Sequence, residues 1–199
     1  MGSYPKTVQL KNGTNVVIRP MTADDLERSH RFFLALPADD RYMLRVDVTD
    51  REAVLLRMDP SPAYDHYRLV ALAGEVIVAD ATLYQPRQGW KRHTAEVRAI
   101  VAHEFRDRGL GALLFHELFQ EATRRKVERL YGMIMSQQEA ARRIADALGF
   151  RVELVLPDQR RTLDGELHDV AVMTVSLKDL WRRLEDKMLA MDGHGRERH

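Results

Sequence analysis

Cysteine is absent from the 199-residue sequence, and long apolar runs and an excess of one charge are absent as well. Without cysteine the chain can form no disulfide, no thiolate metal site and no cysteine nucleophile. No apolar run approaches the ~18 residues that a membrane span needs, and no signal-peptide core opens the chain, so we expect a cytoplasmic protein without membrane attachment. The formal net charge of +1 gives no basic field of the kind that binds nucleic acid. The eight histidines lack ligand spacing, so no metal is expected.

The remaining composition is that of one soluble domain with a substantial core. Apolar residues make up 45% of the chain and charged residues 31%, which are ordinary values for a globular protein. Strand-like and helix-like segments are mixed, with strand–helix–strand units in the second half, and this order predicts an α/β or α+β sheet covered by helices. Two hairpins are expected within residues 7–21 and 67–84, further strands within 95–101, 129–136, 150–157 and 168–177, and helices within 22–36, 50–58, 109–126, 138–148 and 178–191.

The segment AEVRAIVAHEFRDRGLGALL, residues 95–114, carries the most informative pattern. A predicted strand ends at Val101, and a predicted helix begins near Gly109, two residues before a second glycine. Glycine inside a helix costs roughly 0.5–1 kcal/mol relative to alanine, so this pair indicates that something approaches the backbone closely. A helix N-terminus exposes unpaired N–H groups and carries about half a positive charge. Arg106 and Arg108 add to that charge, and the segment therefore favours a diphosphate-binding turn.

Three other motif interpretations fail on single residues. A dinucleotide fingerprint needs a third glycine where the chain has Leu114, and a P-loop needs a Gly-Lys-Ser/Thr sequence that is absent. A zincin helix that starts at His116 needs a second histidine where the chain has Gln120. One structural alternative stays open, in which Gly109 and Gly111 only allow the helix to pack closely on a strand.

The pattern Arg106-x-x-Gly109-x-Gly111 after a strand resembles the coenzyme A signature of the GNAT N-acetyltransferase superfamily. The order of elements from about Thr7 to Leu177 is also similar, and the strings IRPMTADD, FFLALPADDRYMLR, AEVRAIV and ALGF look most like the acetyltransferase domain of bacterial protein lysine acetyltransferases. The resemblance implies a mixed, splayed central sheet of about six to seven strands covered by helices. It makes residues 1–177 the acyltransferase domain and residues 178–199 a C-terminal helix with a polar tail.

The resemblance also implies that acetyl-CoA is the cosubstrate and lies in a gap between the fourth and fifth strands. The backbone of the strand before the gap would pair with the pantetheine arm, and an amide near Ala99 would face the thioester oxygen and stabilise the oxyanion. The N–H groups from Arg106 through Ala112 would hold the pyrophosphate. The implied cofactor-binding residues are Ala99, Ile100, Val101, Arg106, Arg108, Gly109, Leu110, Gly111, Ala112 and Gln138.

Glu96 is the candidate general base, because the resemblance places a glutamate of the "AE" pair in that role. An amine attacks only when neutral, and a lysine with a pKa of about 10.4 is neutral about one time in 2,500 at pH 7. A positioned carboxylate is the usual means of removing that proton. In a second interpretation, Glu96 and Arg98 form the wetter face of the strand and pair with each other. Asp80, on the preceding strand, is the reserve candidate.

Two departures from the family pattern concern the general acid and the pantetheine contact. Many members have a tyrosine four residues before the glycine of "GF", where it protonates the leaving thiolate, but this chain has Ala145. Tyr131 is a weak substitute, since a strand aromatic is more often a core residue, and no general acid is named. The following helix often begins with an asparagine, where this chain has Gln138. His103 is expected to be a loop residue, and His93 is a minor candidate for assisting catalysis.

The sequence thus predicts an N-acyltransferase that moves an acetyl or other short acyl group from CoA directly to an amine in a ternary complex. The acceptor is either a protein lysine, which the resemblance alone favours, or a small amine. A non-catalytic acyl-CoA-binding regulatory module is the alternative, motivated by the missing tyrosine and asparagine. The terminal helix carries one apolar stripe that serves either a homodimer contact or packing on its own domain: Leu177, Leu180, Trp181, Leu184 and Met188.

Overall fold

The computed structural model describes residues 4–44, 46–58, 63–162 and 164–182. Its strands are β1 (Lys6–Gln9), β2 (Asn15–Pro20), β3 (Tyr64–Ala73), β4 (Val76–Pro86), β5 (Thr94–Val101), β6 (Arg129–Met135), β7 (Arg151–Arg161) and β8 (Leu167–Ser176). Its helices are α1 (Leu26–Ala35), α2 (Ala38–Tyr42), α3 (Arg51–Met58), α4 (Leu110–Arg124) and α5 (Glu139–Ala147), with short 3-10 turns η1 (Ala23–Asp25) and η2 (His103–Phe105).

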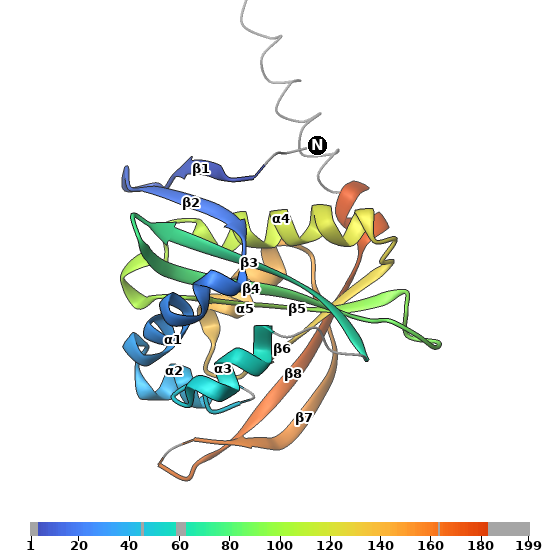
Figure 1. Cartoon of the computed structure of the whole chain (residues 1–199). Helices are drawn as coiled ribbons and strands as arrows, with labels where there is room; N and C mark the ends of the chain where they lie inside the picture. The colour runs from blue at the N-terminus through green and yellow to red at the C-terminus, as the bar shows by residue number, and fades with distance from the viewer. Residues whose placement is uncertain (1–3, 45, 59–62, 163, 183–199) are drawn as a thin grey trace, which may run out of the picture.

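All eight strands belong to one open sheet in the order β1-β2-β3-β4-β5-β6-β8-β7. Helix α4 lies on one face of this sheet, and α1 and α3 lie on the other (Figure 1). The predicted mixed, splayed sheet covered by helices is confirmed. Among the described residues the sheet has one strand more than the upper number that the resemblance implied, because the hairpin β1–β2 extends it at the β3 edge.

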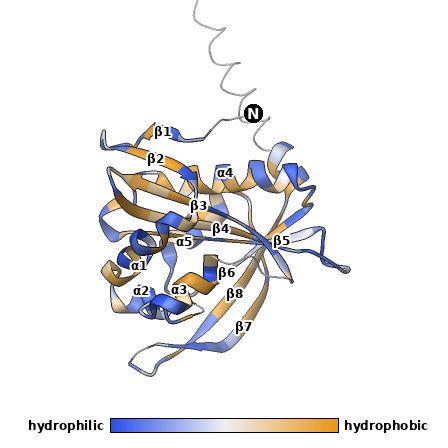
Figure 2. Ribbon diagram, viewed as in Figure 1, coloured by the Kyte–Doolittle hydropathy of each residue, from blue (hydrophilic) through white to orange (hydrophobic). Residues whose placement is uncertain are grey.

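Two apolar clusters hold the layers together. The larger lies between α4 and the sheet and includes Leu114, Leu118 and Leu69, all fully buried. The smaller lies under α1 and α3 and includes Phe33 and Val70. Because successive strand residues point to opposite faces, neighbours such as Leu69 and Val70 supply different clusters. Figure 2 shows the apolar colour following the sheet and the sheet-facing sides of the helices.

The splay of the sheet lies between β5 and β6, which are the fifth and sixth strands in chain order rather than the fourth and fifth. Strand β5 pairs with β4 over six register pairs, from Tyr84↔Glu96 to Ala79↔Val101. Its parallel pairing with β6 covers three pairs and ends at Glu96↔Tyr131. Beyond that pair exposure rises along β5, from buried Val97 to exposed Ala99. The two strands therefore form a fork whose vertex lies at Glu96 and Tyr131.

The C-terminal helix predicted for residues 178–191 begins at residue 177, and residues 177–182 are helical. Leu177 and Leu180 are buried in the larger cluster, and the Trp181 Nε1–H donates to Thr123 Oγ1 of α4 at 3.0 Å. The first turn of the helix thus packs on its own domain. The rest of the apolar stripe lies outside the described residues, and its dimer interpretation stays a prediction.

Two differences from the sequence prediction concern a short helix and the end of a strand. Helix α2 was not predicted, and β7 continues through Pro157 to Arg161 where the predicted strand stopped. An edge strand tolerates proline, and β7 is the last strand of the sheet, with a register shift between Leu156 and Arg160. Among the described helices, none has both the length and the apolar character that crossing a membrane requires.

Candidate active site

The start of α4 is built around the backbone conformation of Gly109. This residue is the N-cap of the helix and has a φ of +87°, in the left-handed region that residues with a side chain rarely adopt. It supplies no capping side chain. The first intrahelical bond runs from Leu113 N–H to Gly109 O at 3.1 Å, so the N–H groups of Leu110, Gly111 and Ala112 have no partner within the helix.

Close packing does not explain the two glycines. A Cβ atom on Gly109 would lie 3.7 Å from Lys11 Cε, and one on Gly111 would lie 3.5 Å from Ile144 Cδ1. Both are ordinary van der Waals distances, so there is space for a Cβ atom at either position. Conformation requires glycine at position 109, and neither glycine is required by crowding from a neighbouring element.

The first turn of α4 carries no negative side chain, and two basic side chains lie beside it. In the first turn of α4 there is no acidic residue, whereas every other described helix or 3-10 turn has one there. The Arg108 guanidinium lies over the Phe105 ring at 5.5 Å, and Lys11 reaches the turn from the β1–β2 hairpin, where its N–H donates to Arg108 O at 3.3 Å. Because a helix N-terminus favours anions, the arrangement can accept a phosphate group.

Arg106 has a different place from the one that the sequence suggested. Its Nε–H donates to Val101 O at 3.0 Å, and its guanidinium forms a close ion pair with Asp40 of α2. Its backbone N–H donates to His103 O at 3.2 Å. Both its side chain and its amide are thus engaged within the protein. The geometry favours Arg106 as the residue that shapes the turn, and the amides available to a ligand start further along the chain.

Gln138 is also tied into the structure. It is the N-cap of α5, its Oε1 accepts from Met135 N–H at 3.0 Å, and its Nε2 approaches Met43 Sδ at 3.2 Å. Helix α2 therefore contacts both the segment that follows β5 and the segment that follows β6. Asp40 pairs with Arg106, and Met43, the residue after α2, contacts Gln138. Beside it lies a cavity of about 260 Å3 lined by Asp39, Tyr42, Met43, Met135, Gln159, Arg160, Arg161 and Thr162.

The candidate base Glu96 lies at the vertex of the fork and is 4% exposed. Its register partners are Tyr84 on β4 and Tyr131 on β6, and directly paired strand residues project to the same face. The three side chains therefore form one row across β4, β5 and β6. This face is the one that α1 and α3 cover over β3 and β4 (Figure 1).

Glu96 and Arg98 form the ion pair that the second interpretation suggested. Arg98 Nε–H donates to Glu96 Oε1 at 2.8 Å, and the Arg98 guanidinium lies 5.3 Å from the centre of the Tyr84 ring. The carboxylate is not on a wet face, however, because it is almost fully buried while Arg98 is about one-third exposed. The pair fixes one carboxylate oxygen and orients the group at the vertex of the fork.

The reserve candidate Asp80 is as buried as Glu96 and is held by arginines. Arg68 Nη1 lies 3.4 Å from one carboxylate oxygen and Arg57 Nη2 lies 3.6 Å from the other. Burial lowers the pKa of Arg57, and the nearby Asp80 carboxylate partly offsets that effect. Asp80 pairs in register with Ile100, four residues from Glu96 along β5. This geometry favours a structural ion pair at Asp80.

The remaining sequence candidates fall into structural positions. Ala145 is 8% exposed and belongs to the larger apolar cluster. His103 is the first residue of the turn η2, and the carbonyl of His93 accepts N–H bonds from Glu128 and Arg129 where β6 begins. Across the described ranges no group of three or more His, Asp or Glu side chains is arranged to hold a metal.

Comparison with known proteins places this arrangement in a family. The profile of the acetyltransferase (GNAT) family matches residues 23–150. The chain belongs to the GNAT acetyltransferase family. A curated relative, acetyltransferase Pat of Mycolicibacterium smegmatis, is 28% identical over 148 residues, which cover 73% of this chain and 44% of that protein. The chain therefore spans less than half the length of that curated relative.

Solved structures of GNAT proteins share the fold. The GNAT domain of S. lividans PAT superposes with a TM-score of 0.68 at 20% identity, covering 86% of this chain and 96% of that domain. A GCN5-related N-acetyltransferase from Kribbella flavida gives 0.70 at 21% identity, covering 81% and 97%. The putative acetyltransferase yncA from Salmonella typhimurium, whose structure contains its cofactor acetyl-CoA, gives 0.65 at 23% identity, covering 81% and 94%.

Proposed function

We propose that this GNAT protein transfers an acetyl group from acetyl-CoA to an amine, with a protein lysine as the leading acceptor class. The observation that carries the proposal has two parts. The start of α4 has no capping side chain and no acidic residue in its first turn, and the pairing of β5 with β6 ends at Glu96, which leaves the rest of that edge of β5 open. A diphosphate fits the first feature, and an extended amide-bearing arm fits the second. Acetyl-CoA has both groups, and the relative yncA was solved with acetyl-CoA as its cofactor.

Each part of acetyl-CoA has a proposed place. The amides of residues 109–112 would hold the pyrophosphate, with Lys11 and Arg108 adding positive charge. The pantetheine arm would run along the open edge of β5, at Ala99, Ile100 and Val101, as an added strand. The arm must end near the vertex of the fork, because pairing with β6 closes that edge at Glu96.

The chemistry would then occur at the vertex. Glu96 accepts a proton from the attacking amine, and the amine nitrogen forms a bond to the acyl carbon. An amide near Ala99 faces the developing oxyanion and stabilises it. Since the sequence has no cysteine to carry an acyl group, direct transfer in a ternary complex is the proposed path, and a trapped acyl-serine would contradict it.

The acceptor class is proposed from the relatives. The resemblance of strings such as AEVRAIV and ALGF to bacterial protein lysine acetyltransferases favours a protein lysine, and acetyltransferase Pat, of which this chain covers 44%, is a relative named as an acetyltransferase. A small-amine acceptor is the second candidate. A panel of amines and lysine-bearing proteins, with release of free CoA as the signal, separates these two acceptor classes.

The general base is tested by Glu96→Gln. A positioned general base contributes typically 10²- to 10⁴-fold, so kcat should fall at least about 100-fold at neutral pH while acetyl-CoA still binds. Glu104→Gln, on the exposed turn η2, is the matched control and should keep full activity. A loss of less than tenfold in Glu96→Gln would remove Glu96 from this role.

A non-catalytic acyl-CoA-binding module is the competing function. Two observations favour it. Glu96, the expected proton acceptor, is buried in an ion pair with Arg98, and Ala145, at the expected position of the proton donor, is buried and has no ionisable group. Steady-state release of CoA by the unmodified protein with any amine would refute it. Binding of acetyl-CoA without turnover across the whole panel would support it.

A further inference from the structure

The leaving sulfur needs a proton donor, and the structure shows that the family's usual position cannot supply one. Ala145 has no ionisable group and lies in the larger apolar cluster at 8% exposure. A donor to the sulfur of CoA must therefore come from another element. This inference rests on the proposed acetyl transfer, and it concerns which side chain meets the sulfur.

The place where the sulfur would lie follows from the strand pairing. An arm that pairs with β5 from Val101 backward meets the closed part of the sheet at the pair Glu96↔Tyr131. Just past this pair the strands are still close, because a Cβ atom on Gly132 would lie 3.5 Å from Val97 O. The thioester must stop at this vertex, where Glu96 belongs to one arm of the fork and Tyr131 to the other.

Tyr131 is a hydroxyl-bearing residue on the β6 side of that vertex. It is half-buried and projects to the same face as Glu96. A donor and an acceptor on opposite arms of a fork can reach two different atoms of a group lying between them. Glu96 would face the attacking amine on one side, and Tyr131 would face the departing sulfur on the other.

The other tyrosine of the row is less suited to this role. Tyr84 is separated from the fork by the whole of β5, and its hydroxyl accepts a hydrogen bond from Arg68 Nη2 at 3.1 Å. Its ring also faces the Arg98 guanidinium. Tyr84 thus contacts Arg68 through its hydroxyl and Arg98 through its ring. Its role in the row is to support the Glu96–Arg98 ion pair.

We propose that Tyr131 is the general acid of the acetyl transfer. As the amine nitrogen bonds to the acyl carbon, Glu96 takes the amine proton and the carbon–sulfur bond breaks. The electron pair of that bond stays on sulfur, which takes the phenolic proton of Tyr131 and leaves as the free thiol. The phenolate then regains a proton from solvent, and Glu96 returns its proton to solvent, so that protons and electrons balance over one turnover.

The expected size of the effect is modest, and it depends on pH. A phenol has an ordinary pKa of about 10, and an alkyl thiol such as that of cysteine has a pKa of about 8.5. The proton transfer is therefore uphill by about 1.5 pKa units, so the contribution should lie near the lower end of general acid catalysis, about 10- to 100-fold at pH 7. As the pH rises past about 10 the phenol loses its own proton, and the advantage of the acid should fade.

The test compares three Tyr→Phe variants by CoA release from pH 6.5 to 11. Tyr131→Phe should lower kcat 10- to 100-fold at pH 7, with KM for acetyl-CoA unchanged, and the loss relative to the parent should shrink as the pH passes about 10. Tyr64→Phe is the control for the substitution, because Tyr64 is 45% exposed on β3, which β4 separates from β5. It should match the parent at every pH. Tyr84→Phe should change kcat by an amount that does not vary with pH.

Each outcome separates this inference from the proposed function. If the parent releases no CoA with any acceptor, the proposed function itself fails. If the parent is active and Tyr131→Phe keeps more than half of its kcat at pH 7, the general acid assignment is wrong while the function stands. A loss that is equal at all pH values would show a structural role for Tyr131 and would also overturn the assignment. Acetyl-CoA binding by the folded variant shows that its site is intact.

Discussion

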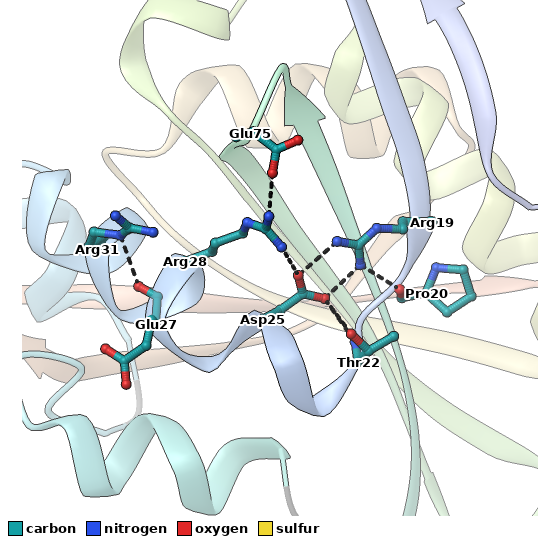
Figure 3. A network of polar contacts seen from close by, with 8 residues as sticks. All are labelled: Arg19, Pro20, Thr22, Asp25, Glu27, Arg28, Arg31 and Glu75. Carbon is teal, nitrogen blue, oxygen red and sulfur yellow. Dashed lines mark hydrogen bonds and ion pairs between the residues drawn. The ribbon is translucent and has the colours of Figure 1, made fainter.

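The starts of η1–α1 and of α4 differ in whether the protein itself supplies an anion to the backbone N–H groups there. At the first, Asp25 is fully buried and accepts from the Thr22 N–H at 2.9 Å. Arg19 binds both oxygens of the same carboxylate at 2.6 and 2.7 Å and holds the pKa of Asp25 at about 2. Arg28 completes the network and reaches Glu75 (Figure 3). This helix start is closed by the protein's own anion.

The start of α4 has neither a cap nor an anion of its own. Gly109 has no side chain to offer, and no acidic residue lies in the first turn. The comparison teaches that a helix start completed by a buried carboxylate contributes to folding stability, whereas a bare one keeps its N–H groups for a ligand. Changes at the two starts should therefore affect different measurements.

The largest expected effect is on stability, at the closed start. Asp25→Ala leaves the Arg19 guanidinium and the Thr22 N–H without their partner, and breaking a buried ion pair in this way costs about 3 kcal/mol or somewhat more. Urea denaturation should show that loss, while the Kd for acetyl-CoA stays within twofold. Asp24→Ala, at the exposed neighbouring position, is the control and should lose less than about 0.5 kcal/mol. A weakened Kd in folded Asp25→Ala would contradict the separation of the two starts.

The second effect is on the pH dependence of stability. The folded pKa of Asp25 is depressed to about 2 from an unfolded value of about 3.9, so its contribution is complete above about pH 5. That contribution, about 2–3 kcal/mol, is lost as the pH falls through 4 towards 2. The difference in unfolding free energy between the parent and Asp25→Asn should therefore shrink over this range. A difference that stays constant from pH 5 to pH 2 would show that the carboxylate charge is not what stabilises this start.

The third effect combines a small loss of stability with a loss of binding. Gly109→Ala and Gly74→Ala each place a side chain at a positive φ, of +87° and +59°, and each should cost about 1–2 kcal/mol of unfolding free energy. Only Gly109→Ala should raise the Kd for acetyl-CoA, by about tenfold, because Gly74 lies in the β3–β4 turn and is not part of the start of α4. Equal affinities in the two variants would show that the turn at Gly109 does not contact the ligand.

The smallest effect concerns the charges beside the open start. Lys11→Ala should weaken acetyl-CoA two- to fivefold at low salt, and the loss should fade as salt screens the exposed charge. Lys91→Ala, in the loop before β5, is a matched exposed lysine and should change nothing. A salt-independent loss in Lys11→Ala would indicate that the packing of its side chain beside the turn, rather than its charge, supports the site.

Local patterns predicted most of the elements on which this site is built. The predicted helix 109–126 is α4, Leu110–Arg124, because apolar periodicity and the glycine at its start are properties of the segment itself. The hairpin turns at Gly13 and Gly74 were predicted for the same reason. The helix start without a capping side chain, and with it the proposed phosphate site, could be inferred from the sequence of residues 106–112 alone.

Features that depend on partners far along the chain could not be predicted. Helix α2 has only five residues after Pro37, too few for a periodic pattern, and its contact with Arg106 joins positions 66 residues apart. Lys11 reaches α4 only because the first hairpin folds beside it. The row formed by Glu96 and Tyr131 depends on strand register, which no local sequence feature records.

Thermal unfolding with acetyl-CoA and with acetyl-pantetheine, which lacks the diphosphate, tests most directly the claim that the bare start of α4 holds a diphosphate. Acetyl-CoA at a hundredfold excess over its Kd should stabilise the protein by about 2.7 kcal/mol, or about 5–10 °C. Acetyl-pantetheine at the same concentration should give a much smaller shift. Equal shifts, or none with millimolar acetyl-CoA, would contradict the claim and leave the turn at Gly109 as a purely structural feature.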